Sequence, residues 1–94
     1  MNITGEQVRK AAIAKKLTRI PHHDCSICGW WVAHVVQDGE LFFDPSCWCS
    51  FGPKPLEPVT WDSVADCINM QTNEKAREHI MDGFGMLPNG EVKP

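Results

Sequence analysis

Four cysteines grouped in two close pairs constrain this chain more than any other feature. Cys25 and Cys28 form a C-x2-C pair, and Cys47 and Cys49 form a C-x-C pair. The stretch between them contains GWWVAHVVQDGELFFD, residues 29–44, in which an Asp-Gly dipeptide separates two runs of β-branched and aromatic residues. That pattern predicts a β-hairpin with a two-residue turn. Because a hairpin brings its two ends together, the second pair should return beside the first.

Paired thiols at this spacing are typical of a structural metal site. In a C-x2-C-G knuckle, a tight turn directs two thiolates and several backbone N–H groups toward one ion. Four thiolates close a tetrahedral sphere around Zn²⁺, with Zn–S distances of about 2.3 Å. The sequence therefore predicts a zinc-ribbon-like arrangement with one structural Zn²⁺, bound by Cys25, Cys28, Cys47 and Cys49.

Other ligand sets and other cysteine chemistry stay open on the sequence alone. The C-x-C pair is tighter than a usual second knuckle, so His22 or His23 could replace one cysteine and give a Cys₃His site. If neither histidine binds the ion, they would orient the ligands from outside the coordination sphere. Iron is a second possible metal, since C-x-x-C-G resembles half of a rubredoxin knuckle. A disulfide pair, free thiols and a redox centre are further alternatives.

Length and composition fit one small domain that a structural metal site would stabilise. A chain of 94 residues has a limited hydrophobic core and little surplus stability. The start, MNITGEQVRKAAIAKK, lacks the apolar run and small-residue cleavage site of a secretory signal. Nothing approaches the roughly 18 consecutive apolar residues of a membrane span. We therefore expect a cytoplasmic protein without a membrane partner, in a compartment where thiols stay reduced.

Helices are predicted on both sides of the hairpin, which gives an α+β fold. Thr4 and Gln7 fit a capping box that opens a helix over about residues 4–18, with Ile13, Leu17 and Ile20 as its apolar stripe. Thr60 should cap a helix ending near residue 70, whose apolar side holds Trp61, Val64, Ala65 and Ile68. A further helix over about 74–82 would end with Gly83 as its C′ residue.

These elements predict one zinc-stabilised domain over residues 1–83. Its parts would be a basic helix (1–20), a zinc hairpin (21–50), a proline-rich connector (51–59) and helices (60–83), with a flexible tail over 84–94.

Both faces of the predicted hairpin are apolar. A tight turn at Asp38-Gly39 would place Val36 opposite Leu41, Val35 opposite Phe42, and His34 opposite Phe43. Alternation then divides the hairpin between two faces. One holds Trp30, Val32, His34, Val36, Leu41 and Phe43, and the other holds Trp31, Ala33, Val35 and Phe42. An isolated hairpin needs cover, so helices should cover both faces or one face should remain for a partner.

The first twenty residues carry a local excess of positive charge. Glu6 opposes five basic residues there, Arg9, Lys10, Lys15, Lys16 and Arg19, whereas the rest of the chain has four basic and eleven acidic residues. Such a segment could contact phosphates, with an exposed tryptophan stacking on bases. It could equally be a solvated helix face. The overall pI of about 5.7 lies far from that of a typical nucleic-acid-binding domain.

The cysteine region resembles a known kind of small protein. HHDCSICGWWVAHVVQDGELFFDPSCWCS followed by TWDSVADCINMQ is similar to short uncharacterised proteins encoded by phages and prophages. Those share a C-x-x-C-G, a G-x-L-x-F-D strand, a C-x-C and a Trp-led helix. The resemblance covers about residues 22–82. It implies a mobile-element origin and a metal site, and it brings no activity with it.

Function is expected to be non-enzymatic. Four thiolate ligands leave no open position for a catalytic water, and no phosphate loop, nucleophile elbow or H-E-x-x-H motif is present. The four tryptophans exceed what so small a core needs, and tryptophan is favoured at interface anchors. The sequence therefore favours a protein-interaction module that binds a host or phage protein or a second copy of itself, with Trp31, Trp48 and Phe42 as contacts. A nucleic-acid-binding zinc ribbon is the alternative.

Overall fold

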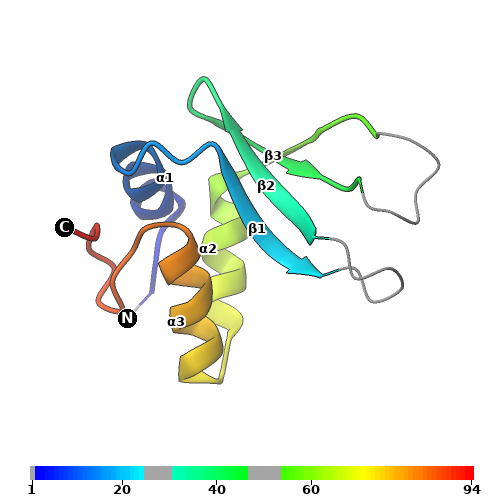
Figure 1. Ribbon diagram of the computed structural model, residues 1–94. Helices are drawn as coiled ribbons and strands as arrows, with labels where there is room; N and C mark the ends of the chain where they lie inside the picture. Colours follow the sequence, from blue (N-terminus) through cyan, green and yellow to red (C-terminus); the bar gives the residue numbers. More distant parts are fainter. Residues whose placement is uncertain (1, 25–30, 47–53) are drawn as a thin grey trace. The chain divides into compact units, whose positions relative to one another are not determined.

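The computed structural model describes residues 2–24, 31–46 and 54–94 (Figure 1). The chain divides into two units. The helical unit comprises Met1–Leu17 and Thr60–Pro94, and the sheet unit comprises Thr18–Val59. Within the described residues there are three helices and one four-stranded antiparallel sheet, which confirms the predicted α+β class.

Local capping signals place the helix starts where the sequence predicts them. Helix α1 spans Gly5–Ala14, and both halves of the capping box between Thr4 and Gln7 are present. Helix α2 spans Trp61–Met70, and the Thr60 side chain accepts a hydrogen bond from the Ser63 backbone N–H. Helix α3 spans Glu74–Gly83. The Asn73 side chain caps it by accepting from the N–H groups of its first turn.

Helix α1 packs through small residues instead of the expected stripe. Its buried residues are Gly5, Val8, Ala11 and Ala12. Ile13 is 43% exposed, and Ile20 belongs to a strand. The small side chains let α1 approach α2 closely. A Cβ atom added to Gly5 would lie only 2.7 Å from the Asp62 backbone nitrogen. Backbone proximity therefore takes the place of a large apolar surface in this contact.

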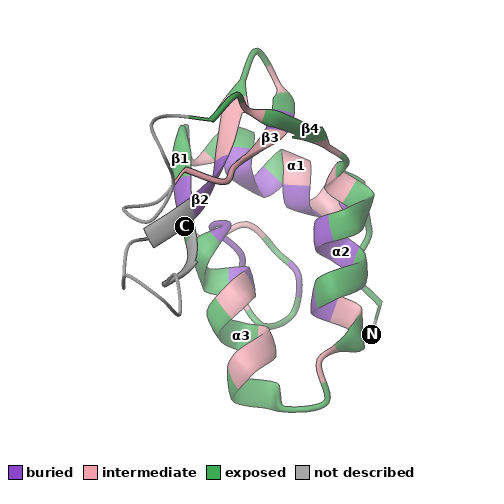
Figure 2. Cartoon of the chain, turned by 90° about the vertical axis from the view of Figure 1, so that its right-hand side faces the viewer, coloured by how far each residue is buried: buried purple, intermediate pink, exposed green. Residues whose placement is uncertain are grey.

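A pair of hydrogen bonds ties the first residues to α2. The Ile3 backbone N–H donates to Asn69 Oδ1, and Asn69 Nδ2 donates to the Ile3 carbonyl, both at 2.8 Å. The amide thus pairs with the Ile3 main chain as a neighbouring strand would. The Ile3 side chain is buried. On α2, the buried side is formed by Val64, Ala65 and Ile68, as predicted (Figure 2).

Two helices end in the same left-handed motif. After α1, Leu17 N–H donates to the Ala12 carbonyl and Lys16 N–H to the Ile13 carbonyl, with Lys16 at φ 55°. After α3, Met86 and Gly85 repeat this pattern, and Gly85 has φ 80°. Both are Schellman motifs. They end α1 earlier than the expected residue 18 and make Gly85, not Gly83, the C′ residue of α3.

Residues 84–94, expected as a flexible tail, fold back on the helical unit. Phe84 and Met86 are buried, and Met86 forms an isolated β-bridge with Val92. A turn closed by a hydrogen bond from Gly90 N–H to the Leu87 carbonyl (2.9 Å) lies between these two positions. Gly85 has a left-handed conformation, which lets the chain reverse direction after α3. Burial of the apolar side chains that follow stabilises the returning segment.

The sheet has the strand order β1-β2-β3-β4. Strand β2 (Trp31–Gln37) and strand β3 (Glu40–Asp44) form the predicted hairpin. Their register, with Val36 opposite Leu41, Val35 opposite Phe42 and His34 opposite Phe43, confirms the expected pairing. Asp38 and Gly39 both have positive φ angles, 53° and 79°. That conformation is the one a primed two-residue hairpin turn requires.

Two further strands lie at the sheet edges, where the sequence predicted a helix end and a connector. Strand β1 (Arg19–Asp24) pairs with β2, and strand β4 (Glu57–Val59) pairs with β3. Each contains a proline, Pro21 and Pro58. Proline has no backbone N–H, so it is tolerated in an edge strand, where the missing donor can face away from the neighbouring strand. Because proline argues against a strand in a local pattern, the sequence did not predict these two strands.

The two faces of the sheet differ in burial. The register places Ile20, His34 and Leu41 on one face, here called the core face, and all three are buried. The opposite face, here called the open face, has a row across all four strands formed by Arg19, Val35, Phe42 and Pro58. Every residue of that row is half-buried or exposed.

Replacement of Gly5 by Ala should destabilise the helical unit. The added methyl group would meet the α2 backbone, so we expect the free energy of unfolding to fall by about 1–3 kcal/mol, as for overpacked cores. Chemical denaturation measures this value. Gly83→Ala, at an exposed position in the last turn of α3, is the control and should be neutral or stabilising. Equal stability of Gly5→Ala and wild type would contradict the close approach.

Replacement of Lys16 by Gly should stabilise the helical unit. A residue with a Cβ atom pays about 1–2 kcal/mol in the left-handed region, and the greater freedom of glycine in the unfolded chain offsets part of the gain. We expect a net increase of about 0.5–1 kcal/mol in the free energy of unfolding. Lys16→Ala removes the charge but keeps the Cβ atom. Stabilisation by alanine equal to that by glycine would show that charge, not backbone conformation, is responsible.

Candidate metal centre and the sheet end that flanks it

The four predicted thiolate ligands lie outside the described residues, as does Trp48. These cysteines are Cys25, Cys28, Cys47 and Cys49. Within residues 2–24, 31–46 and 54–94, no group of three or more histidine, cysteine or acidic side chains is arranged to hold a metal. Cys67 is exposed on α2, because the buried side of that helix is formed by Val64, Ala65 and Ile68.

The strand termini that flank the two cysteine pairs lie at the same end of the sheet. Asp24, the last residue of β1, pairs with Trp31, the first residue of β2, and Asp44, the last residue of β3, pairs with Ala33. The Asp38-Gly39 turn lies at the other end of β2 and β3 (Figure 1). The chain therefore leaves the sheet toward the two cysteine pairs from β1 and β3, with β2 between them, and neighbouring strands in a sheet are about 4.8 Å apart.

His22 and His23 lie at an irregularity in β1. The β1–β2 register shifts between Pro21 and His23, so His22 is the extra residue of a bulge, and His23 pairs with Val32. Bulges bend a strand and change the direction of nearby residues. The backbone therefore brings both histidines to the sheet end from which the first cysteine pair departs. The orientation of their side chains lies outside the described features.

Asp44 connects β3 to β1 and to the chain that follows. Its Oδ2 accepts a hydrogen bond from Arg19 Nη1 at 3.0 Å, and its Oδ1 accepts one from the Ser46 backbone N–H at 3.0 Å. The Arg19 bond is the main cause of a pKa of the Asp44 carboxyl below its usual value, and the Ser46 bonds lower it further. Asp44 is therefore held as a carboxylate, although half-exposed Arg19 limits the energy of the pair.

Ser46 links the two ends of the segment that contains the second cysteine pair. Its Oγ accepts a hydrogen bond from Lys54 N–H at 2.9 Å and lies 3.5 Å from the Lys54 carbonyl, to which it donates. Residues 47–53 are thus bracketed by a side chain that contacts the main chain on the far side. This pair could not be predicted from the sequence, because nothing in the local pattern relates Ser46 to Lys54.

Of the predicted partner contacts, Phe42 is the one whose surroundings are described. It lies in the open-face row between Val35 on β2 and Pro58 on β4, and it is half-buried. Trp31 begins β2, but its side chain is outside the described features. His34 belongs to the core face, where it is 8% exposed and meets Phe43 edge to face with ring centroids 5.6 Å apart.

The basic residues proposed for phosphate contact do not share one helix. Arg9 and Lys10 lie on α1, and Lys16 is in the left-handed turn that follows. The Lys15 ammonium donates to the Pro94 main-chain oxygen at 2.8 Å. Arg19 belongs to the sheet unit, where it pairs with Asp44. The five residues are therefore divided between the two units, contrary to the expected basic helix over residues 1–20.

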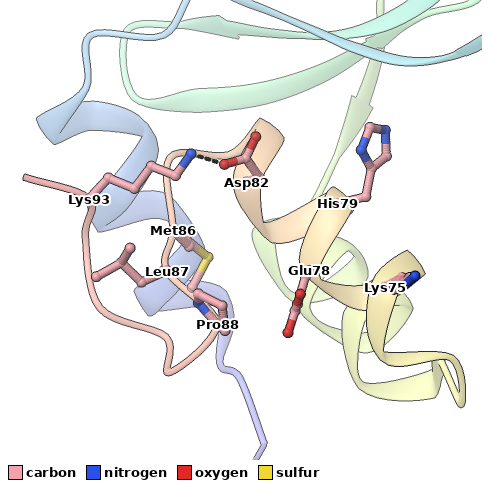
Figure 3. Close-up of a pocket in the computed structure, with 8 residues that line it drawn as sticks. All are labelled: Lys75, Glu78, His79, Asp82, Met86, Leu87, Pro88 and Lys93. Carbon is pink, nitrogen blue, oxygen red and sulfur yellow. Dashed lines mark ion pairs between the residues drawn. The ribbon is translucent and has the colours of Figure 1, made fainter.

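A shallow hollow of about 440 Å³ lies in the helical unit and is lined by α3 and by the segment that was expected to be a flexible tail. The residues that line it come from α3 and the folded-back segment, and they are Lys75, Glu78, His79, Asp82, Met86, Leu87, Pro88 and Lys93 (Figure 3). An ion pair between Lys93 and Asp82 crosses one end. The lining contains two lysines and two acidic residues, so it carries no net charge of either sign apart from His79.

Comparison with protein-family models, with curated proteins and with solved structures finds no match to this chain. In the described portion, every helix is too short or too polar to cross a membrane.

Proposed function

We propose that this chain is a small, non-enzymatic protein-interaction module whose sheet unit is stabilised by one structural Zn²⁺. Cys25, Cys28, Cys47 and Cys49 would bind the ion in a zinc-ribbon-like site, with His22 or His23 as a spare ligand or supporting group. One observation carries the proposal. The chain leaves for the first cysteine pair from β1, returns to β2, and leaves for the second pair from β3, and these three successive strands of one sheet have the termini in question at the same end.

Chemistry and size support zinc in this position. Thiolates are preferred ligands of Zn²⁺, and four of them would give a closed, structural site. The sheet unit is small, and one of its edge strands has only three residues. A metal that binds the folded unit and not the unfolded chain would add its binding energy to folding.

The surface suited to a partner is the open face of the sheet. Its row contains Val35, Phe42 and Pro58, which present apolar area that is half-buried or exposed. Addition of a partner strand to either edge is disfavoured. Strand β1 contains a proline and a bulge, and β4 contains a proline and is short. The partner would therefore bind across the face, and it would be a host or phage protein in the cytoplasm, or a second copy of the chain.

A nucleic-acid-binding role has no comparable observation in its favour. Two of the five basic residues proposed for it, Lys15 and Arg19, already interact with Pro94 and Asp44. Those two belong to different units. The interaction module is accordingly the function proposed.

Purified protein should contain one equivalent of zinc per chain. Cys25→Ser or Cys47→Ser should release the ion and unfold the sheet unit, because metal-binding energy is folding energy in a small domain. Metal analysis gives the stoichiometry, and amide NMR spectra follow the sheet residues. Cys67→Ser is the matched control and should keep both metal and fold, since its side chain is exposed on α2. A metal-free protein with an unchanged sheet spectrum would refute the structural role of zinc.

Substitutions of Phe42 and of its neighbour Phe43 should affect different properties, the first partner affinity and the second stability. Phe42→Ala removes apolar area from the open face, so affinity for a partner identified by cross-linking should fall by about 2 kcal/mol, as for an interface anchor. Phe43 lies opposite His34 on the core face, and Phe43→Ala should mainly lower stability, by up to about 3 kcal/mol. Binding calorimetry measures the affinity for the partner, and denaturant melts measure the free energy of unfolding. The reverse pattern would mean that the partner binds the core face.

A further inference from the structure

The segment that folds back after α3 forms a small hairpin over residues 85–93. The Leu87 N–H donates to the Glu91 carbonyl at 2.8 Å, and the Gly90 N–H donates to the Leu87 carbonyl at 2.9 Å. Gly90 has φ 89°, which lies in the left-handed region. Three residues thus separate the paired positions, and a left-handed residue closes the loop, as in a common class of hairpin. We call this element the 85–93 hairpin.

The loop of this hairpin contains Asn89 followed by Gly90. Glycine has no side chain to hinder attack on the preceding residue, so Asn-Gly is the asparagine dipeptide most prone to deamidation. In that reaction the Gly90 backbone nitrogen loses its proton and bonds to the Asn89 side-chain carbon Cγ, and ammonia leaves. Water then opens the cyclic imide at either carbonyl, which yields aspartate or isoaspartate. Water is the only other reactant, and Asn89 is exposed to it.

The closed hairpin engages both reacting groups. The Gly90 N–H is hydrogen-bonded to the Leu87 carbonyl, and Gly90 is buried. Asn89 Oδ1 accepts a hydrogen bond from the Glu91 N–H at 2.9 Å, which restrains the carboxamide. Attack on Cγ requires the first bond to break and the carboxamide to rotate out of the second. Deamidation should therefore start from an open state of the hairpin, reached by local unfolding.

Contacts at the base hold the hairpin closed. The Lys93 N–H donates to the Gly85 carbonyl at 3.0 Å, and the Lys93 ammonium pairs with Asp82 on α3 (Figure 3). Met86 is buried and forms a β-bridge with Val92. Because both side chains of the ion pair are partly exposed, the pair adds little. Burial of Met86 and the main-chain bonds therefore supply most of the closing energy.

We propose that Asn89 is a modification site guarded by the 85–93 hairpin, and that its conversion to isoaspartate is a one-way switch for the folded-back segment. Isoaspartate places one extra carbon atom in the main chain between Leu87 and Gly90. The hydrogen bonds that close the loop then lose their register, and Met86 loses its cover. Aspartate keeps the normal main chain and an oxygen for the Glu91 N–H, so it should leave the hairpin closed. This inference is independent of the zinc site and of the partner.

The first test measures the rate of deamidation at Asn89. The full chain is incubated at mildly alkaline pH, in buffer and in guanidinium chloride, and mass spectrometry of its peptides quantifies asparagine, aspartate and isoaspartate. We expect the native protein to react at least roughly tenfold more slowly than the denatured chain, because opening limits the reaction. Equal rates in the two solvents would overturn the guarding role.

A substitution at the hairpin base should remove the protection. Gly85 has φ 80°, and a Cβ atom there would lie 2.7 Å from Lys15 Cγ, so Gly85→Ala should open the hairpin and speed deamidation roughly tenfold. Gly83→Ala, the same change in the last turn of α3, is the matched control and should leave the rate unchanged. If Gly85→Ala fails to fold, Asp82→Ala removes the ion pair and should give about a twofold increase. Rates equal to wild type in both Gly85→Ala and Asp82→Ala would contradict the proposal.

The second test examines the switch itself. Protein with isoaspartate at position 89 is separated by chromatography, and amide NMR follows the signals of Met86 and Val92. These signals should move to positions typical of an unfolded segment, whereas Asn89→Asp should keep them close to wild type. Native signals in the isoaspartyl protein would overturn the switch. Loss of the signals in Asn89→Asp as well would assign the effect to charge and not to the longer main chain.

Discussion

The left-handed turn at Asp38 and Gly39 is the constraint on which the geometry of the sheet unit depends. Both residues have positive φ, and this conformation sets the pairing of β2 with β3. A shift of one residue would exchange the two faces, because side chains alternate along a strand. It would also move Asp44 away from Ala33 and from the reach of Arg19. The turn therefore determines both the buried face and the strand end from which the cysteine pairs depart.

Sequence reasoning succeeded where structure is decided by local contacts. The caps at Thr4 and Thr60, and the Asp-Gly hairpin with its register, all depend on residues a few positions apart. Such signals act within one element, so a single sequence contains them in full. The buried side of α2 followed for the same reason, since the spacing of Val64, Ala65 and Ile68 repeats with the helix turn.

The failures involve contacts between distant parts of the chain. Strands β1 and β4 exist because β2 and β3 offer free edges, and their prolines argued against strands when considered locally. The end of α1 was misplaced because Lys16 adopts a conformation that normally selects glycine or asparagine. Likewise, Ser46 and Lys54 are eight residues apart and contact through one hydroxyl. The composition of the segment between them contains no sign of this bond.

The ion pair between Arg19 and Asp44 lies on the same side of the sheet as the proposed partner surface. Arg19 stands in the same row as Val35 and Phe42, and Asp44 is two residues along β3 from Phe42, so its side chain faces the same way. A partner bound across this row would cover the half-exposed guanidinium and strengthen its attraction to Asp44 by excluding water. A partner bound there would therefore also strengthen the link that this ion pair makes between β1 and β3 across β2.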